Sequence, residues 1–231
     1  MRTTIEFKRP DGETVQGYLA EPEAAAGAPA VVVIQEWWGL NRQIRGVADR
    51  LAAAGYRALV PDLYRGKSTV EVEEAHHLMS GLNFSDAAAQ DVRGALQYLK
   101  ATGSAKVGVT GYCMGGGLTV LALSMAPEAD AGVVWYGYPP LELVNASSIH
   151  APLLAHWATQ DGAFAIAGVD ALEQKLRAAK VAYTGHRYLA QHGFANETAQ
   201  GPGRDAIAQY DAAWAQMAWD RTLRFFGHHL G

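Results

Sequence analysis

The pattern of apolar and polar positions changes character after the first thirty residues. Residues 4–8 and 15–20 alternate apolar and polar positions on either side of Asp11-Gly12, a dipeptide typical of tight turns. These two segments predict an antiparallel hairpin. From residue 30 the runs become continuously apolar, as in "AVVVIQ", which is typical of strands covered on both faces.

Strand-like runs and helical periods then alternate along the chain. The segment 30–35 is predicted as a strand, and a helical period follows from Asn41 to Gly55. This alternation predicts an α/β fold with a mainly parallel sheet, helices on both faces, and one domain over residues 1–231. Further strands are predicted at 56–61, 106–111, 131–137, 152–158 and 182–189, and further helices at 72–80, 85–100, 115–125, 165–178 and 205–226.

Composition narrows the class of function. Hydrophobic residues make up 49% of the 231 residues, charged residues make up 18%, and the net charge is −4. No uninterrupted apolar stretch is long enough for a membrane span, and no cluster of Lys and Arg indicates nucleic-acid binding. The N-terminal residues lack the pattern of a secretory signal. We therefore expect a cytoplasmic monomer that acts on a small molecule.

The single cysteine, Cys113, lies between glycines in "GYCMGGG", directly after a predicted strand. The segment from Gly111 to Gly115 has the form G-x-nucleophile-x-G of a strand-turn-helix elbow. Its turn is so sharp that the outer positions must be nearly free of side chains, as glycine is. The N-terminus of the following helix would favour the thiolate. The motif alone leaves open the alternative of a buried, structural thiol.

Two later strand ends supply partners for the cysteine. Asp161 follows the strand predicted at 152–158, and His192 follows the strand predicted at 182–189. The carboxyl ends of parallel strands meet at one edge of a sheet, so both side chains are expected near the sulfur. His192 would share the thiol proton and Asp161 would orient its ring. The remaining histidines are expected in strands, loops or the C-terminus, and their spacing predicts no metal site.

Glu36 is the acidic residue with the most unusual surroundings. It directly follows the apolar strand "VVVIQ" and precedes "WWGLN". Burial beside a thiol would raise its pKa and let it accept or share the sulfur proton. The alternative is a carboxylate at the start of a helix, facing water. Backbone amides of Trp37 and Met114 are the candidate donors of an oxyanion hole.

Five segments in this order resemble the dienelactone hydrolase family, also called carboxymethylenebutenolidases. They are "QEWWGL", "PDLYRG", "GYCMGGG", "TQDGAF" and "QHGFAN", and the resemblance spans nearly the whole chain. It implies an α/β-hydrolase fold without a cofactor. It also implies Cys113 as nucleophile, completed to a triad by His192 and Asp161, with Glu36 helping to ionise the thiol. The implied reaction is hydrolysis of a lactone or activated ester through a thioester.

The substrate-binding residues are less defined. Tyr64, Trp135 and Tyr136 are expected to line the pocket, although aromatic residues near strand ends could equally belong to the core. The helix expected at 72–80 could act as a cap over the site. The family holds the carboxylate of dienelactone with arginines, whereas Asn196 stands at one such position here and the cap segment, residues 68–83, contains none. The candidate replacements on neighbouring loops are Arg65 and Arg204, and the loop 199–205 that carries Arg204 is expected to help shape the pocket. The resemblance therefore implies the ester-cleaving machinery without specifying dienelactone as substrate.

Two other functions fit the same sequence. A non-catalytic protein could use the pocket to bind a small molecule without turning it over. An exposed thiol of low pKa could also sense peroxide, but the chain has no second cysteine to resolve the sulfenic acid.

Overall fold

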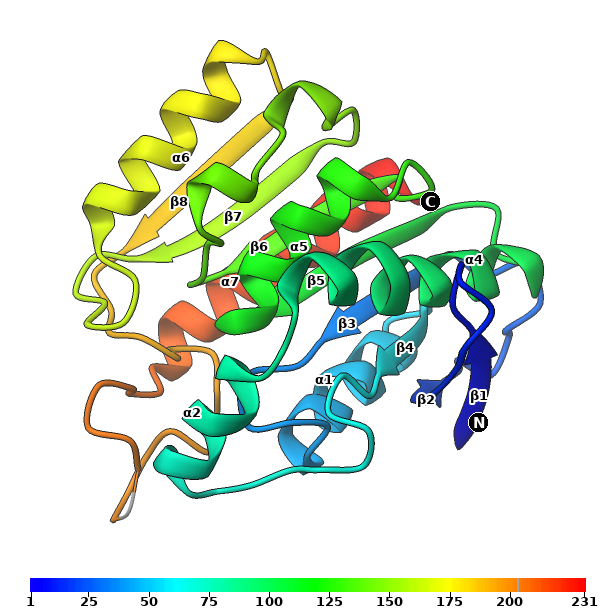
Figure 1. Cartoon of the computed structure of the whole chain (residues 1–231), viewed down its shortest axis with the longest axis horizontal. Helices are drawn as coiled ribbons and strands as arrows, with labels where there is room; N and C mark the ends of the chain where they lie inside the picture. Colours follow the sequence, from blue (N-terminus) through cyan, green and yellow to red (C-terminus); the bar gives the residue numbers. More distant parts are fainter. Residues whose placement is uncertain (203) are drawn as a thin grey trace.

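The computed structural model describes residues 1–202 and 204–231, in which eight strands form one twisted sheet flanked by helices (Figure 1). The strand order is β1-β2-β4-β3-β5-β6-β7-β8. The first two pairings, β1 with β2 and β2 with β4, are antiparallel, and the other pairings are parallel. The strands are β1 (Arg2–Lys8), β2 (Thr14–Ala20), β3 (Ala30–Ile34), β4 (Arg57–Pro61), β5 (Val107–Tyr112), β6 (Ala131–Trp135), β7 (Leu153–Ala158) and β8 (Tyr183–Tyr188).

Helices cover both faces of this sheet. Figure 1 shows α4, α5 and α6 in front of the strands and α7 behind them. Every residue of β3, β4, β5, β6 and β7 is buried, because helices or neighbouring strands cover both faces. The helices are α1 (Arg42–Ala53), α2 (Val72–Ser80), α3 (Phe84–Asp86), the π-helix η1 (Ala87–Val92), α4 (Arg93–Ala101), α5 (Met114–Met125), the 3-10 turns η2 (Leu141–Leu143) and η3 (Ala146–Ser148), α6 (Ile166–Ala178) and α7 (Ala212–His229).

The predicted architecture is confirmed, with two local differences. The closing helix was expected over 205–226, but it begins at Ala212. Its N-terminal cap is Asp211, whose carboxylate accepts from two helical amides. The residues before it form a loop held by an isolated bridge between His192 and Ala208. In the helix expected over 85–100, η1 interrupts the α-helical hydrogen bonding.

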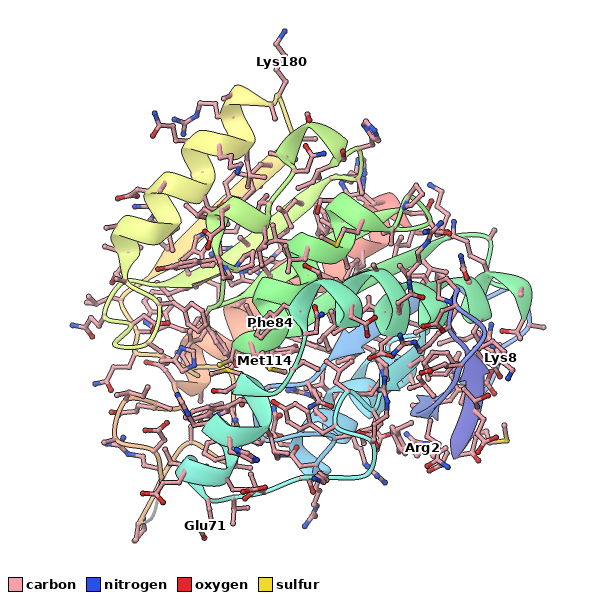
Figure 2. The ribbon with its side chains drawn as sticks, viewed as in Figure 1. Arg2, Lys8, Glu71, Phe84, Met114 and Lys180 are labelled. Carbon is pink, nitrogen blue, oxygen red and sulfur yellow. The ribbon has the colours of Figure 1, made fainter. Side chains whose placement is uncertain are left out.

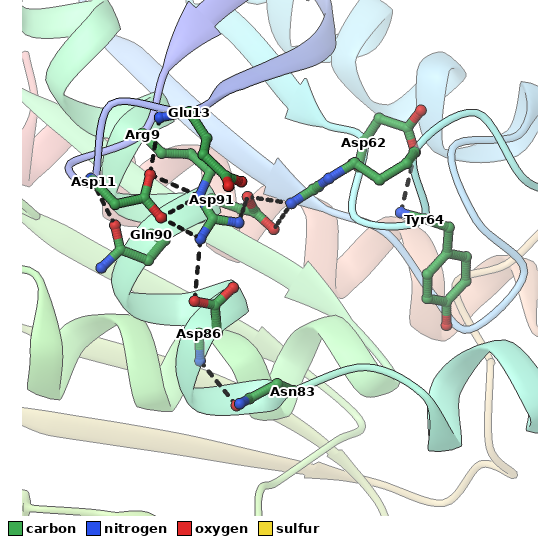
Figure 3. A network of polar contacts seen from close by, with 10 residues as sticks. Arg9, Asp11, Glu13, Asp62, Tyr64, Asn83, Asp86, Gln90 and Asp91 are labelled. Carbon is green, nitrogen blue, oxygen red and sulfur yellow. Dashed lines mark hydrogen bonds and ion pairs between the residues drawn. The ribbon is translucent and has the colours of Figure 1, made fainter.

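An ion-pair network attaches the N-terminal hairpin to these helices (Figure 3). Arg9 pairs with Asp91 at 3.2 Å and with Asp86 at 3.1 Å, and Arg65 pairs with Asp91 at 2.8 Å. Burial raises the pKa of Asp91, although both guanidinium groups oppose the shift. Arg65 donates to the Asp62 carbonyl and to Asp91, and it does not line the cysteine cavity described below.

Across the described part of the chain, no helix combines the length and the apolar character needed to cross a bilayer.

Candidate active site

Cys113 occupies the sharp turn between β5 and α5. Its φ of 55° and ψ of −119° lie in a region that non-glycine residues rarely adopt. A Cβ at Gly111 would overlap the carbonyl of Gly115, and a Cβ at Gly115 would come within 2.5 Å of the Ile34 carbonyl oxygen. The glycines on both sides of the cysteine are therefore required by the backbone geometry.

The loop after β6 supports the same turn. A Cβ at Gly137 would overlap the carbonyl of Cys113. The loop packs so closely against the elbow that only glycine fits at this position. Its neighbour Tyr136 is fully buried and also has a positive φ, 37°. Such strain persists only where surrounding packing enforces it. No local pattern distinguishes Gly137, because a single glycine at the end of a predicted strand is common.

Asp161 and His192 lie at the carboxyl ends of β7 and β8, the same edge of the sheet as the elbow. His192 Nδ1 is 2.9 Å from Asp161 Oδ2. The other carboxylate oxygen accepts 2.8 Å hydrogen bonds from the amides of Ala163 and Phe164. These contacts orient the imidazole so that Nδ1 faces Asp161 and Nε2 remains for the sulfur.

The charge balance around His192 favours its protonated form. Burial alone would lower the pKa of His192. The neighbouring Cys113 sulfur and the hydrogen-bonded Asp161 carboxylate outweigh burial and hold the pKa of His192 well above its ordinary value. An imidazolium beside the sulfur stabilises a thiolate, the nucleophilic form of cysteine.

Glu36 is buried among uncharged hydrogen-bond donors. Its Oε1 accepts from the Tyr136 hydroxyl at 3.1 Å, and its Oε2 accepts from the Asn196 amide at 2.7 Å. Burial raises the pKa of Glu36, while His192 and the two hydrogen bonds partly oppose that rise. Asn196 is itself oriented, since its Oδ1 accepts from the backbone and side chain of Thr198.

These groups meet at a cavity of about 400 Å³. Five residues predicted for the site line it: Glu36, Trp37, Cys113, His192 and Asn196. Asp161 lies behind His192, in contact with the ring rather than with the cavity.

The two amides predicted for the oxyanion hole belong to neighbouring elements. Met114 is the first residue of α5, where amide groups have no acceptor within the helix. Figure 2 shows its side chain near the centre of the molecule. Trp37 belongs to the turn after β3 and lines the cavity.

Three residues expected at the pocket do not line the cavity. Tyr64 donates a 3.3 Å hydrogen bond to the sulfur of Met114. Trp135 stacks on Tyr112 with ring centroids 4.9 Å apart, inside the core. Tyr136 contacts Glu36 and supports the wall from behind. Aromatic character near a strand end does not reveal which side of the strand end faces a cavity.

The remaining lining residues come mainly from the turn after β3, the segment around α2 and the loop before α7. The helix α2 was expected to cap the site, and its residue Met79 lines the cavity. Phe164 stacks on His192 with ring centroids 5.6 Å apart. The loop 199–205, which was expected to help shape the pocket, contributes Ala199, Gln200, Pro202, Arg204 and Asp205. Motif reasoning did not identify Trp38, Asn41, Thr69, Val70, Ala163, Phe164, Gly193, Thr198, Ile207 and Ala208.

Within residues 1–202 and 204–231, no group of three or more His, Cys, Asp or Glu side chains is arranged to hold a metal ion.

Comparison with known proteins agrees with this geometry. The model of the dienelactone hydrolase family matches residues 15–230. "Protein usf" of Aquifex pyrophilus is 33% identical over 240 residues, covering 100% of both chains. A protein of Escherichia coli K12, provisionally named carboxymethylenebutenolidase, is 30% identical over 238 residues, covering 95% of this chain and 84% of its own.

Solved structures resemble the fold over nearly its whole length. A protein provisionally described as a dienelactone hydrolase, from Klebsiella pneumoniae, superposes with a TM-score of 0.84 at 28% identity, covering 98% of this chain and 99% of its own. A dienelactone hydrolase-like promiscuous phosphotriesterase from metagenomic libraries superposes with a TM-score of 0.86 at 23% identity, covering 100% of this chain and 99% of its own. At this identity the similarity supports the fold and no further property. The chain belongs to the dienelactone hydrolase family and is a carboxylic ester hydrolase of that family.

Proposed function

We propose that this protein hydrolyses lactones or activated carboxylic esters with Cys113 as the nucleophile, through a thioester. The observation that carries the proposal is the convergence of three elements on one cavity. The sulfur occupies a strained turn, its neighbour His192 has a raised pKa, and Asp161 orients that imidazole at 2.9 Å. A purely structural cysteine would need neither the strain nor the oriented imidazole.

In the first half of the reaction the thiolate attacks the ester carbonyl carbon and a carbon–sulfur bond forms. The carbonyl oxygen takes the negative charge, which the amides of Trp37 and Met114 stabilise. The bond to the leaving oxygen then breaks, its electron pair moves to that oxygen, and the His192 imidazolium supplies the proton. In a lactone the leaving oxygen stays attached to the acyl group.

In the second half, water attacks the thioester carbonyl and gives a proton to His192. The carbon–sulfur bond breaks, and the thiolate and the carboxylic acid product are released. Glu36 has a raised pKa and lines the same cavity, so it can take up the proton of a neutral thiol before the cycle begins.

Labelling and substitution test the proposal directly. Cys113 is the only cysteine, so labelling of the protein's thiol with iodoacetamide reports on this site alone. We expect one label per chain, loss of aryl-ester cleavage in step with labelling, and a mass increase of one acyl group when acid traps the enzyme during turnover. Cys113→Ala should lose both the label and the activity. Full activity in Cys113→Ala, or in fully labelled protein, would refute a cysteine nucleophile.

A further inference from the structure

Aromatic and aliphatic side chains form much of the cavity wall beside Cys113. Trp37 and Trp38 contact each other edge to face, with ring centroids 5.0 Å apart. Phe164 lies against the His192 ring from another element, and Met79 of α2 completes this part of the wall. Surfaces of this kind bind apolar groups by removing both partners from water.

The charges in the described lining do not provide a free cation for a carboxylate. Arg204 is the only arginine or lysine among those residues, and Asp205 lies next to it in the lining. The guanidinium nitrogen Nη1 of Arg204 already donates to the backbone carbonyls of Asp205, Ala206 and Ala208, at 3.2, 3.4 and 2.8 Å. Arg204 Nη1 therefore secures its own loop.

The other two positions considered for carboxylate binding are also unsuited. Arg65 does not line the cavity, because it pairs with Asp91 at 2.8 Å. Asn196 is uncharged, and its amide group donates to Glu36. The two cations of the described lining are already engaged, His192 by Asp161 and Arg204 by the carbonyls of its own loop. A carboxylate on the substrate would therefore lose its hydration without meeting a cation that is not already engaged, and it would face the buried Glu36.

Apolar residues also flank the cavity on the solvent side. Val70 is 84% exposed and Ile207 is 41% exposed, and both belong to the lining. They come from separate segments, the loop before α2 and the loop before α7. Large exposed apolar residues beside a cavity are typical of ligand-binding surfaces. An apolar substituent that reaches out of the cavity would cover them.

These observations together define a substrate class. We propose that the site takes uncharged carboxylic esters with an apolar acyl or alcohol group, and selects against substrates that carry a free carboxylate. The inference rests on the proposed function, since it names the substrate of the same site.

A matched pair of esters tests the selection. 4-Nitrophenyl 4-methylpentanoate and mono-4-nitrophenyl succinate have similar shapes, but the first ends in two methyl groups and the second in a carboxylate. We expect kcat/KM, measured after subtraction of the enzyme-free hydrolysis of each ester, to be at least about tenfold higher for the uncharged ester. An equal or higher corrected value for the succinate would overturn the proposal.

Two valine variants separate a local effect from general electrostatics. Val70→Lys places a cation at the cavity opening and should narrow the preference for the uncharged ester by raising kcat/KM for the succinate. Val72→Lys makes the same change two residues away, where the side chain is 46% exposed and outside the lining, and should leave the preference unchanged. Equal effects of the two substitutions would count against recognition by the cavity walls.

Binding to Cys113→Ala keeps this inference separate from the proposed function. Tryptophan fluorescence measures the affinity of this variant for each ester. We expect the uncharged ester to bind at least about tenfold more tightly than the succinate. If wild type cleaves neither ester, the proposed function fails, whereas the binding preference still decides the substrate class. Equal binding of the two esters would overturn the inference even if both are cleaved.

Discussion

The side-chain amide of Asn196 donates a 2.7 Å hydrogen bond to the carboxylate of Glu36, which lies 160 residues earlier in the chain. The bond joins the loop after His192 to the turn after β3 and places both residues at the cysteine cavity. It also opposes the burial that raises the pKa of Glu36. The protonation of this carboxyl group therefore depends on an uncharged partner.

Asn196→Leu should raise the pKa of Glu36 further, because the ionised carboxylate loses a donor and remains buried. If Glu36 accepts the thiol proton, the acid limb of the profile of kcat/KM against pH should move to higher pH. Thr198→Val is the control, since it removes one donor to Asn196 and leaves the bond to Glu36 in place. An unmoved acid limb in Asn196→Leu would show that Glu36 does not set it.

Glu36→Gln keeps the size of the side chain and removes its ability to accept a proton. We expect kcat/KM to fall by about 10²-fold or more, the range of general-base contributions, with an unchanged far-UV circular dichroism spectrum. Assay at higher pH should restore part of the activity if the lost step is ionisation of Cys113. Wild-type activity at neutral pH would assign Glu36 a purely structural role.

His156 makes folding stability depend on pH. It is fully buried between Tyr188 and Thr222, and burial lowers its pKa well below 6.5, with the charges of His186 and Arg221 acting in the same direction. The unfolded chain then binds a proton before the folded chain does. The free energy of unfolding should be fully retained above about pH 6.5 and decrease below it, by up to ~1.4 kcal/mol per pH unit.

Urea unfolding at several pH values between 5 and 8 measures this dependence. The difference between wild type and His156→Gln isolates the contribution of this residue from those of His186 and His192. The two proteins should differ most above pH 6.5 and converge as the pH falls. Parallel curves would mean that folding does not shift the pKa of His156.

Asp91→Asn should destabilise the fold, because Arg9 would keep its buried charge with one partner fewer. The side chains of Arg9 and Asp91 are 7% and 2% exposed, whereas that of Arg65 is 45% exposed. We expect a loss of about 3 kcal/mol in the free energy of unfolding for Asp91→Asn, and less than about 1 kcal/mol for Arg65→Gln. Similar losses for the two variants would contradict the importance of burial in this network.

Gly111→Ala should disrupt the elbow, because its Cβ would overlap the carbonyl of Gly115. We expect loss of esterase activity and a melting temperature lower by several degrees. Gly46→Ala is the matched control within α1, where the nearest atom to the added carbon is 3.9 Å away. This second change should leave activity intact and stabilise the helix by up to ~1 kcal/mol.

Local sequence chemistry was enough to predict the strands and to place Cys113, Asp161 and His192 at one edge of the sheet. Continuous apolar runs locate the buried strands, and Gly111 and Gly115 mark the elbow through their backbone requirements. Asp161 and His192 follow from the rule that parallel strands end at one edge. The start of α7 was missed because the preceding loop is organised by contacts with the His192 segment, which lies far away in the sequence.

The sequence by itself determined the α/β architecture, the position of Cys113 in a tight turn and the strand ends that carry its partners, because these depend on local periodicity and on steric demands at glycine. Only the tertiary structure decided which side chains face the cavity, that Trp135 and Tyr136 lie behind its wall, and that Arg204 is tied to its own loop. Those outcomes depend on how segments separated by up to 160 residues pack together, which no local pattern records.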